Sequence, residues 1–223
     1  MINKNFIVMK KFCTICILFC LFFYSGAFAQ VLENIPYPIE VYNNPVDYSI
    51  SKTELTISAK AKTNLFNNPA GTSKVNNAAM ALFEPKGDFT LTAKVTGELK
   101  AVYDVAALLV YQDENLWAKF CYENSVKKQP TIVSVVTRDY SDDCNSVLAG
   151  EYAYMSVVRK GNEFSFFYSA DNKNWNMIRN FNLNITGQIK LGFAAHGSRG
   201  DGFTAIFSEI RYKDEALSDM RDL

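Results

Sequence analysis

Between residues 41 and 212 the chain alternates apolar and polar positions over short stretches. Residues 54–60, 89–95 and 164–168 all follow this pattern. Successive side chains of a β-strand point to opposite faces, so a period of two predicts half-buried strands. Residues rich in Gly, Asn, Asp and Pro separate these stretches, as at 67–71 and 160–162, and indicate turns. No long stretch shows the helical period of 3.6. The pattern therefore predicts an all-β protein of roughly a dozen strands, an antiparallel β-sandwich or jelly roll.

The densest apolar stretch predicts three consecutive strands, at residues 103–111, 117–123 and 130–138. The short turn at 112–116 indicates that the first two form a hairpin. Alternation divides the second strand into two faces. The face expected in the core carries Ala118, Phe120 and Tyr122. The face expected to be solvated carries Trp117, Lys119, Cys121 and Glu123.

The first 29 residues have the pattern of a secretory signal peptide. They contain three lysines and no acid, then an apolar run over 12–24, and they end in Ala27-Phe28-Ala29. The run is short for a bilayer span, and no later segment reaches about 18 apolar residues, so no membrane insertion of the mature chain is expected. We expect a single domain over residues 30–212, a short polar tail over 213–223, and a secreted or periplasmic location.

The charge balance excludes several partners. The whole chain has 23 basic and 23 acidic residues, and removal of the signal lysines leaves 20 basic against 23 acidic. A slightly acidic protein is not attracted to nucleic acid or to an anionic membrane surface. We therefore expect no nucleic-acid partner.

Of five cysteines, only Cys121 and Cys144 remain after removal of the signal. In an oxidising compartment this pair predicts a disulfide, the alternative being two unrelated thiols. Two cysteines and His196, the only histidine, are too few ligands for a structural zinc site.

Several short motifs follow one another within residues 48–212. They are Thr63-Asn64-Leu65-Phe66, Tyr103-Asp104-x-Ala106-x-Leu108, Trp117-x-Lys119-x-x-x-Glu123, Ser134-Val135-Val136-Thr137-Arg138, Ser141-Asp142 and Ser169-x-Asp171-x-x-x-Trp175. In these the chain resembles the uncharacterised family of concanavalin A-like β-sandwich domains that includes the yeast regulation-of-enolase protein. The resemblance implies a jelly roll with a concave sheet face, and no assigned reaction. Ala107, Tyr111, Cys121 and His196-Gly197 depart from the residues usual in that family.

Carbohydrate binding is the function that the predicted solvated face favours. Sugars stack on aromatic rings, and their hydroxyls bind charged and amide side chains. The candidate ligand-binding residues are Tyr111 and Trp117 for stacking, Lys119, Glu123 and Thr137 for hydrogen bonds, and His196 at the border of the site. We expect an exported, non-catalytic, lectin-like module whose partner is a glycan or glycoconjugate.

Two other functions remain open. A glycan-active hydrolase would use Glu123 as acid or nucleophile with a second carboxylate near it. The Glu-x-Asp core of the glucanases of this fold is absent, and Asp104 is expected on the opposite face. The third alternative is a scaffold or interaction domain without a small ligand.

No cofactor is expected apart from calcium. Asp201, or the acidic loop with Asp139, Asp142 and Asp143, could hold a structural calcium ion. The sequence has no phosphate-binding glycine loop, Cys-x-x-Cys or His-Glu-x-x-His motif.

Overall fold

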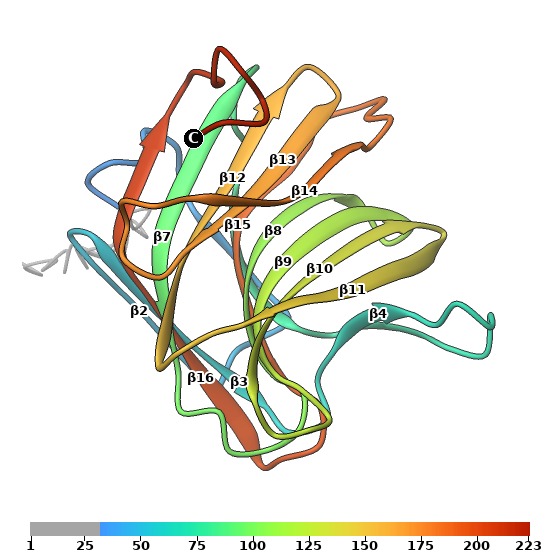
Figure 1. Ribbon diagram of the computed structural model, residues 1–223. Helices are drawn as coiled ribbons and strands as arrows, with labels where there is room; N and C mark the ends of the chain where they lie inside the picture. Colours follow the sequence, from blue (N-terminus) through green and yellow to red (C-terminus); the bar gives the residue numbers. More distant parts are fainter. Residues whose placement is uncertain (1–31) are drawn as a thin grey trace, which may run out of the picture.

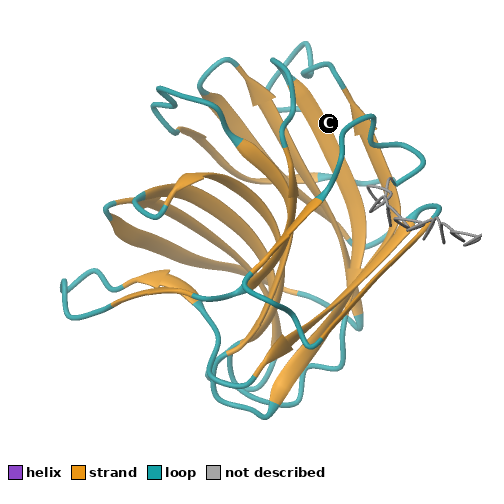
Figure 2. Ribbon diagram, turned by 180° about the vertical axis from the view of Figure 1, so that it is seen from behind, coloured by secondary structure: helices purple, strands orange, loops and turns teal. Residues whose placement is uncertain are grey.

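The computed structural model describes residues 32–223, so the predicted signal peptide lies outside the described residues. Their strands form two large sheets that face each other as a β-sandwich, with a small third sheet beside them (Figures 1 and 2). All strands within the sheets pair in antiparallel fashion. The all-β sandwich predicted from the alternation is confirmed.

Each large sheet has seven strands. Sheet A contains, in spatial order, β1 (Glu40–Tyr42), β6 (Ala79–Phe83), β15 (Lys190–Gly197), β8 (Asp104–Asp113), β9 (Leu116–Asn124), β10 (Pro130–Arg138) and β11 (Tyr140–Leu148). Sheet B contains β14 (Asn176–Asn182), β13 (Glu163–Ser169), β12 (Tyr152–Lys160), β7 (Phe89–Thr96), β16 (Gly202–Lys213), β3 (Glu54–Lys60) and β2 (Asp47–Ser51). The small sheet is the hairpin of β4 (Leu65–Asn67) and β5 (Lys74–Asn76).

The main core lies between the inner faces of the two sheets. Ala118, Phe120 and Tyr122 of β9 belong to it, as the alternation predicts. The ring of Phe120 stacks on Phe166 of β13, with 4.8 Å between centroids, and so joins the two layers. Burial of a phenylalanine side chain of this kind stabilises a fold by about 1.5–3 kcal/mol.

The outer face of sheet A is buried, and the expectation of a solvated face is wrong. Trp117 and Cys121 are fully buried, and Lys119 and Glu123 are 3% and 9% exposed. Strands β8–β11 bend into an arch, and the β4–β5 hairpin extends beside the hollow side of that arch (Figures 1 and 2). Leu65 of β4 forms a second apolar cluster with this face. Alternation alone predicts which side chains share a face, but it carries no information on the hairpin that covers them.

The C-terminal residues after β16 pack on the outer face of sheet B. Met220 is 5% exposed and contacts the apolar cluster of Val158 and Phe167. The hydroxyl of Ser165 donates a hydrogen bond to the Met220 carbonyl. The predicted tail over 213–223 is therefore fastened to the sandwich although it forms neither helix nor strand beyond Lys213.

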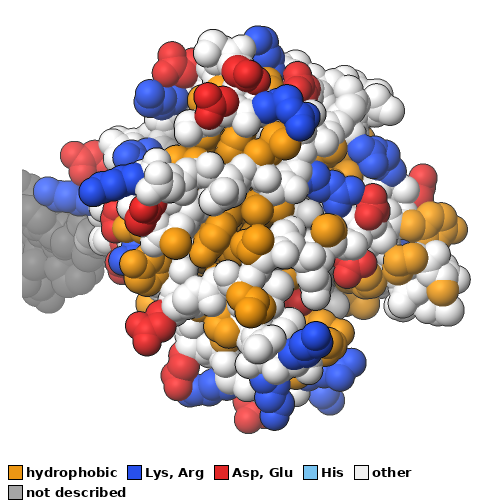
Figure 3. Space-filling model, in the orientation of Figure 1, with side chains coloured by type: hydrophobic (Ala, Val, Ile, Leu, Met, Phe, Trp, Pro, Cys, Tyr) orange, Lys and Arg blue, Asp and Glu red, His pale blue; other side chains and the backbone are white. Residues whose placement is uncertain are grey.

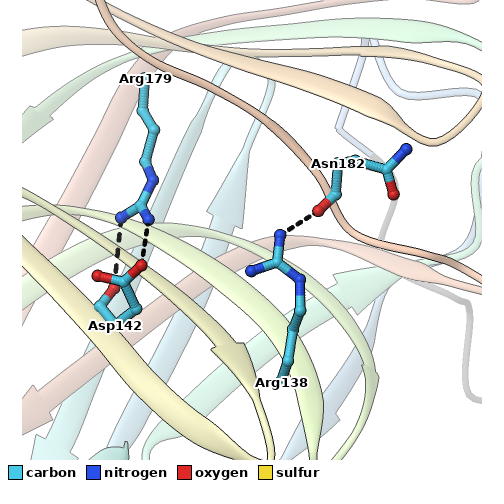
Figure 4. Close-up of polar contacts among 4 residues, drawn as sticks. All are labelled: Arg138, Asp142, Arg179 and Asn182. Carbon is cyan, nitrogen blue, oxygen red and sulfur yellow. Dashed lines mark hydrogen bonds and ion pairs between the residues drawn. The ribbon is translucent and has the colours of Figure 1, made fainter.

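Polar contacts bridge the edge strands β11 and β14 of the two sheets (Figure 4). Arg179 on β14 pairs with the carboxylate of Asp142 on β11 at 2.7 Å. Arg138, at the end of β10, donates a hydrogen bond to the carbonyl of Asn182. Seen from the same side as Figure 1, apolar side chains occupy the centre of the surface, with charged ones mostly toward its periphery (Figure 3).

Candidate functional site

A cavity of about 160 Å³ opens on the outer face of sheet A, between the sheet and the residues that lead into the β4–β5 hairpin. Its polar wall is formed by Asn64, Tyr103, Lys119, Glu123, Asp143 and His196, and its apolar wall by Phe66, Val133 and Val135. Lys119, Glu123 and His196 were predicted as ligand-binding residues, and the structure brings these three together. They come from β9 and β15, which are not neighbours in the sheet.

The register of the sheet explains why the cavity forms here. Glu123 and His196 lie in one row across the sheet, since both pair with Val105 of β8. The next row toward Lys119 is formed by Cys121, Ala107 and Ala194. These three side chains are short, so they fill little of the space above the sheet between Lys119, Glu123 and His196. The small residues therefore leave room in which Lys119 and His196 can meet.

A chain of hydrogen bonds fixes the orientation of His196. Lys119 Nζ lies 3.2 Å from His196 Nε2, and His196 Nδ1 lies 3.3 Å from Ser198 Oγ. Ser198 Oγ in turn donates to the Thr63 carbonyl at 3.2 Å. An ammonium can only donate, so Nε2 is assigned as the acceptor and Nδ1 as the protonated nitrogen of a neutral imidazole.

Burial sets the protonation of this histidine. Burial and the positive charge of Lys119 lower the pKa of His196 well below its usual value, against a smaller opposing effect of the Tyr103 backbone contact. A second positive charge next to Lys119 inside the protein would be costly. His196 is consequently neutral at physiological pH, in agreement with the hydrogen-bond chain.

The pKa of Glu123 is shifted in the opposite direction. Burial raises the pKa of Glu123 to about 7, because the charged carboxylate is disfavoured away from water. The charge of Lys119 lowers this pKa and that of Asp143 raises it, but burial dominates. Glu123 is thus protonated in slightly acidic solution, where its carboxyl group can donate a hydrogen bond as well as accept one.

Tyr103 is held in the wall by a strained loop. Its φ is 64°, a left-handed conformation that bulky residues rarely adopt. The buried carboxylate of Asp104 accepts hydrogen bonds from the backbone N–H groups of Lys100 and Ala101, and the Tyr103 N–H donates to the Asn124 carbonyl. The Arg199 guanidinium lies 5.0 Å from the centre of the Tyr103 ring. Backbone strain of this kind is concentrated at functional sites.

The other predicted ligand-binding residues lie outside the cavity and support the hairpin. Trp117 is fully buried, so it offers no exposed ring for a sugar. The Tyr111 hydroxyl accepts a hydrogen bond from the side chain of Asn76 on β5. The Thr137 hydroxyl contacts Ser141 Oγ at 2.9 Å, and Ser141 Oγ accepts a bond from the backbone of the hairpin.

The predicted disulfide is absent, because Cys121 is a buried free thiol and Cys144 an exposed one. Strand β10 separates β9 from β11, so two strand spacings, about 9–10 Å, lie between the cysteines. Cys121 pairs with Val133 and Cys144 with Ser134, the next residue, so the two thiols point to opposite faces. A disulfide needs Cα atoms within about 7 Å. The alternative of two unrelated thiols is the one that the structure has.

No group of three or more acidic, His or Cys side chains suited to a metal occurs among residues 32–223. In the acidic loop proposed for calcium, Asp142 is engaged by Arg179. Asp143 instead lines the cavity, and its cross-strand partner Val135 shows that it lies on the outer face of sheet A.

Sequence reasoning missed half of the polar wall. Asp143 could have been placed only with the pairing of β10 and β11, which is shifted by a bulge near Ile132. Asn64 and Tyr103 lie within the family motifs, but they are in loops where alternation gives no direction.

The fold and this cavity define an antiparallel β-sandwich with a small polar pocket on the hollow face of one sheet. The chain belongs to the family described as "Protein of unknown function (DUF1349)", whose model matches residues 41–215. The resemblance inferred from the motifs is confirmed. No curated protein matches the sequence.

Solved structures share the fold. A functionally unknown protein from Saccharomyces cerevisiae is 21% identical with a TM-score of 0.74, over 81% of this chain and 97% of that protein. A xylan beta-1,4-xylosidase from Bacillus halodurans is 11% identical with a TM-score of 0.57, over 78% of this chain and 38% of that protein. The Bacteroides ovatus protein named Xyloglucan PUL GH43B is 14% identical with a TM-score of 0.59, over 76% of this chain and 34% of that protein. The two larger proteins thus match in about a third of their length.

The described residues contain no helix long and apolar enough to cross a membrane.

Proposed function

We propose that this protein is an exported, non-catalytic carbohydrate-binding module that holds one sugar residue in the cavity on the outer face of sheet A. The observation that carries the proposal is the convergence of three buried polar side chains, Lys119, Glu123 and His196, beside the rings of Phe66 and Tyr103. Binding sites for small ligands combine apolar walls with a few convergent polar groups in this way.

The size of the cavity and the fold support a sugar as the ligand. A cavity of about 160 Å³ has room for a single sugar ring rather than for a bound chain. Ring faces can stack against Phe66 or Tyr103, and hydroxyls can exchange hydrogen bonds with the Glu123 carboxyl group. The similar folds in a xylosidase and in a protein named for xyloglucan support a carbohydrate ligand by analogy only.

The test is a glycan array with the purified chain and two matched variants. Glu123→Met keeps most of the length of the side chain but removes the carboxyl group that would hydrogen-bond a sugar hydroxyl, and should lose most of the binding. Glu209→Gln is the control, because Glu209 lies on β16 of sheet B, away from the cavity. Binding that is as strong in Glu123→Met as in the unmodified protein, or no binding to any glycan, would contradict the proposal.

A glycan-active hydrolase is a second candidate, because two carboxyl groups line the same cavity. Glu123 has the raised pKa that a general acid needs, and Asp143 is the second carboxylate that such a reaction requires. Asp104 is excluded from this role, since its carboxylate caps the preceding loop. We favour binding without reaction, because Asp143 is two strands from β9 and, through Val135, lies in the row of Lys119 rather than in that of Glu123.

The two candidates separate in one assay. A glycan that binds on the array is incubated with the purified chain, and new reducing ends are measured over time. The binding module leaves the glycan intact. Turnover that Glu123→Gln and Asp143→Asn both abolish, with binding retained, would establish the hydrolase instead.

A further inference from the structure

Lys119 carries a buried positive charge with no acidic partner. Its side chain lies on the outer face of sheet A and is 3% exposed. Among the ion pairs of the described residues, none includes Lys119. Its hydrogen-bond partner is the neutral imidazole of His196 at 3.2 Å. A buried ammonium is costly unless it is paired, so this arrangement calls for an anion from outside the protein.

The ammonium keeps donors free to meet such an anion. An ammonium has three N–H donors, and His196 Nε2 occupies one of them. The rings of Trp117 and Phe66 lie 5.8 and 6.0 Å from Nζ, and aromatic rings offer weak attraction rather than full hydrogen bonds. Because Lys119 lines the cavity, its remaining donors are accessible to a ligand there.

The acids near Lys119 do not replace that anion. The buried Glu123, whose pKa is raised to about 7, is protonated in slightly acidic solution. Asp143 is exposed, so water screens its charge, and none of the ion pairs of the described residues joins it to Lys119. Below about pH 7 the three buried polar residues of the cavity wall, Lys119, Glu123 and His196, therefore have a net positive charge, carried by Lys119.

We propose that the sugar bound in this cavity is acidic, a uronic acid or similar carboxylate-bearing sugar, and that its carboxylate contacts Lys119 Nζ. This inference rests on the proposed function and narrows its ligand class. The sugar ring lies between Phe66 and Tyr103, and the Glu123 carboxyl group hydrogen-bonds a ring hydroxyl. A hydrogen bond between an ammonium and a carboxylate is short and about twice as strong as a neutral one.

A carboxylate fits better than a phosphate. Lys119 is the one cationic side chain among the lining residues that the structure describes. Sites for phosphate usually combine arginines, helix N-termini or loops of backbone N–H groups, and residues 32–223 contain no helix. One buried cation matches one monoanion.

The experiment compares sugars that differ only in the acidic group. Binding to the purified chain is measured by calorimetry at pH 6 for methyl glucuronide against methyl glucoside, and for methyl galacturonide against methyl galactoside. At least one acidic sugar should bind at least about tenfold more tightly than its neutral counterpart. Sodium sulfate and sodium phosphate should not compete at concentrations comparable with the sugar.

Two lysine variants place the effect. Lys119→Met keeps the length of the side chain and should remove the acidic preference, so that the acidic sugar binds no more tightly than its neutral counterpart. Lys94→Met is the matched control, because Lys94 also lies over an aromatic ring, Tyr152 at 4.4 Å, but on sheet B. It should leave the preference unchanged.

The outcomes separate the two proposals. Equal binding of acidic and neutral sugars overturns the acidic ligand and leaves sugar binding intact. Competition by sulfate or phosphate as strong as by the acidic sugar shows a general anion site and also overturns it. No binding of any sugar overturns both proposals. An acidic preference that persists in Lys119→Met would mean that another group holds the carboxylate.

Discussion

Glu123 and His196 line one cavity, and burial acts on their charges in opposite directions. Burial raises the pKa of the Glu123 carboxyl group to about 7 and lowers that of the His196 imidazole well below its usual value. In each case burial favours the neutral form. The two residues therefore respond to the same desolvation with opposite effects on stability as the pH changes.

For Glu123, the folded protein holds a proton that the unfolded chain loses near its ordinary pKa of 4.5. Its contribution to stability is complete below pH 4.5 and is lost as the pH rises to about 7. For His196, the unfolded chain binds a proton below pH 6.5 that the folded protein does not accept. Its contribution is complete above pH 6.5 and is lost as the pH falls.

We therefore predict that the two effects partly cancel between about pH 5 and 7. In Glu123→Gln the free energy of unfolding should rise with pH over this range, because only the histidine effect remains. In His196→Gln it should fall with pH. The variation should be on the order of 1–3 kcal/mol, measured by urea unfolding at half-unit steps of pH. If the free energy of unfolding changed with pH in the same direction in both variants, burial would not shift the pKa values of Glu123 and His196 in opposite directions.

For single residues, the sequence predicted the direction of the side chains of β9 but not of those in the loops. Alternation along residues 117–123 correctly placed Lys119 and Glu123 on one face, because the direction of a side chain in a strand depends only on its position. It could not predict that this face is buried. Tyr103 was out of reach, because its direction depends on a left-handed backbone conformation stabilised by contacts of Asp104 and Asn124.

Strand order, rather than strand content, decides the chemistry of the two cysteines. β10 separates the strands that carry Cys121 and Cys144, and the spacing along the chain does not reveal this. Burial raises the pKa of the Cys121 thiol to about 12, so its reactive thiolate is scarce. Cys144 is exposed on β11.

Thiol labelling should therefore distinguish the two cysteines. In the native protein an alkylating reagent should modify Cys144 and leave Cys121 intact. After denaturation without reductant, both should be modified, as peptide mapping by mass spectrometry would show. If both resist labelling after denaturation without reductant, they are bridged and the strand order is wrong.

The β4–β5 hairpin is the element that closes the outer face of sheet A. Asn67, which is 1% exposed, fastens it to the turns of the adjacent strands. Its side-chain amide donates hydrogen bonds to the Glu114 and Asp139 carbonyls, each at 3.0 Å, and its backbone N–H donates to Ser141 Oγ. Both turns end strand pairs of sheet A, so one residue ties the hairpin to β8–β11.

Asn67→Ala should loosen this hairpin and expose Trp117. Loss of the two part-buried hydrogen bonds that the Asn67 amide donates to the Glu114 and Asp139 carbonyls should lower the free energy of unfolding by about 1–3 kcal/mol. In a Trp175→Phe background Trp117 is the only tryptophan, so acrylamide quenching of its fluorescence reports its exposure. Quenching should increase in Asn67→Ala. The control Lys74→Ala removes one exposed hydrogen bond of the same hairpin and should change little. Unchanged quenching in both would show that the hairpin does not depend on Asn67.

At the scale of the whole molecule, the fold could be predicted well and the site only in part. The short alternating stretches and the family motifs were sufficient for an antiparallel sandwich. The cavity depends on contacts between segments far apart in sequence, such as the 3.2 Å contact of Lys119 with His196. No local pattern encodes that distance, because it follows from the order of β15, β8 and β9 in the sheet and from the short side chains between them.

Export of the whole chain is a prediction that rests on its first 29 residues. If that segment is a signal peptide, the protein purified from the periplasm or the medium should begin at Gln30, and intact mass spectrometry should find the mass of residues 30–223. Ala29→Asp should block cleavage, because signal peptidase requires a small residue there. Thr53→Asp is the control, because Thr53 lies in an exposed turn of the folded domain and its substitution should leave cleavage unchanged. Recovery of a chain that retains residues 1–29 in the soluble fraction would contradict export. A chain that stays inside the cell would also not meet extracellular polysaccharides, so the proposed acidic sugar would need another source.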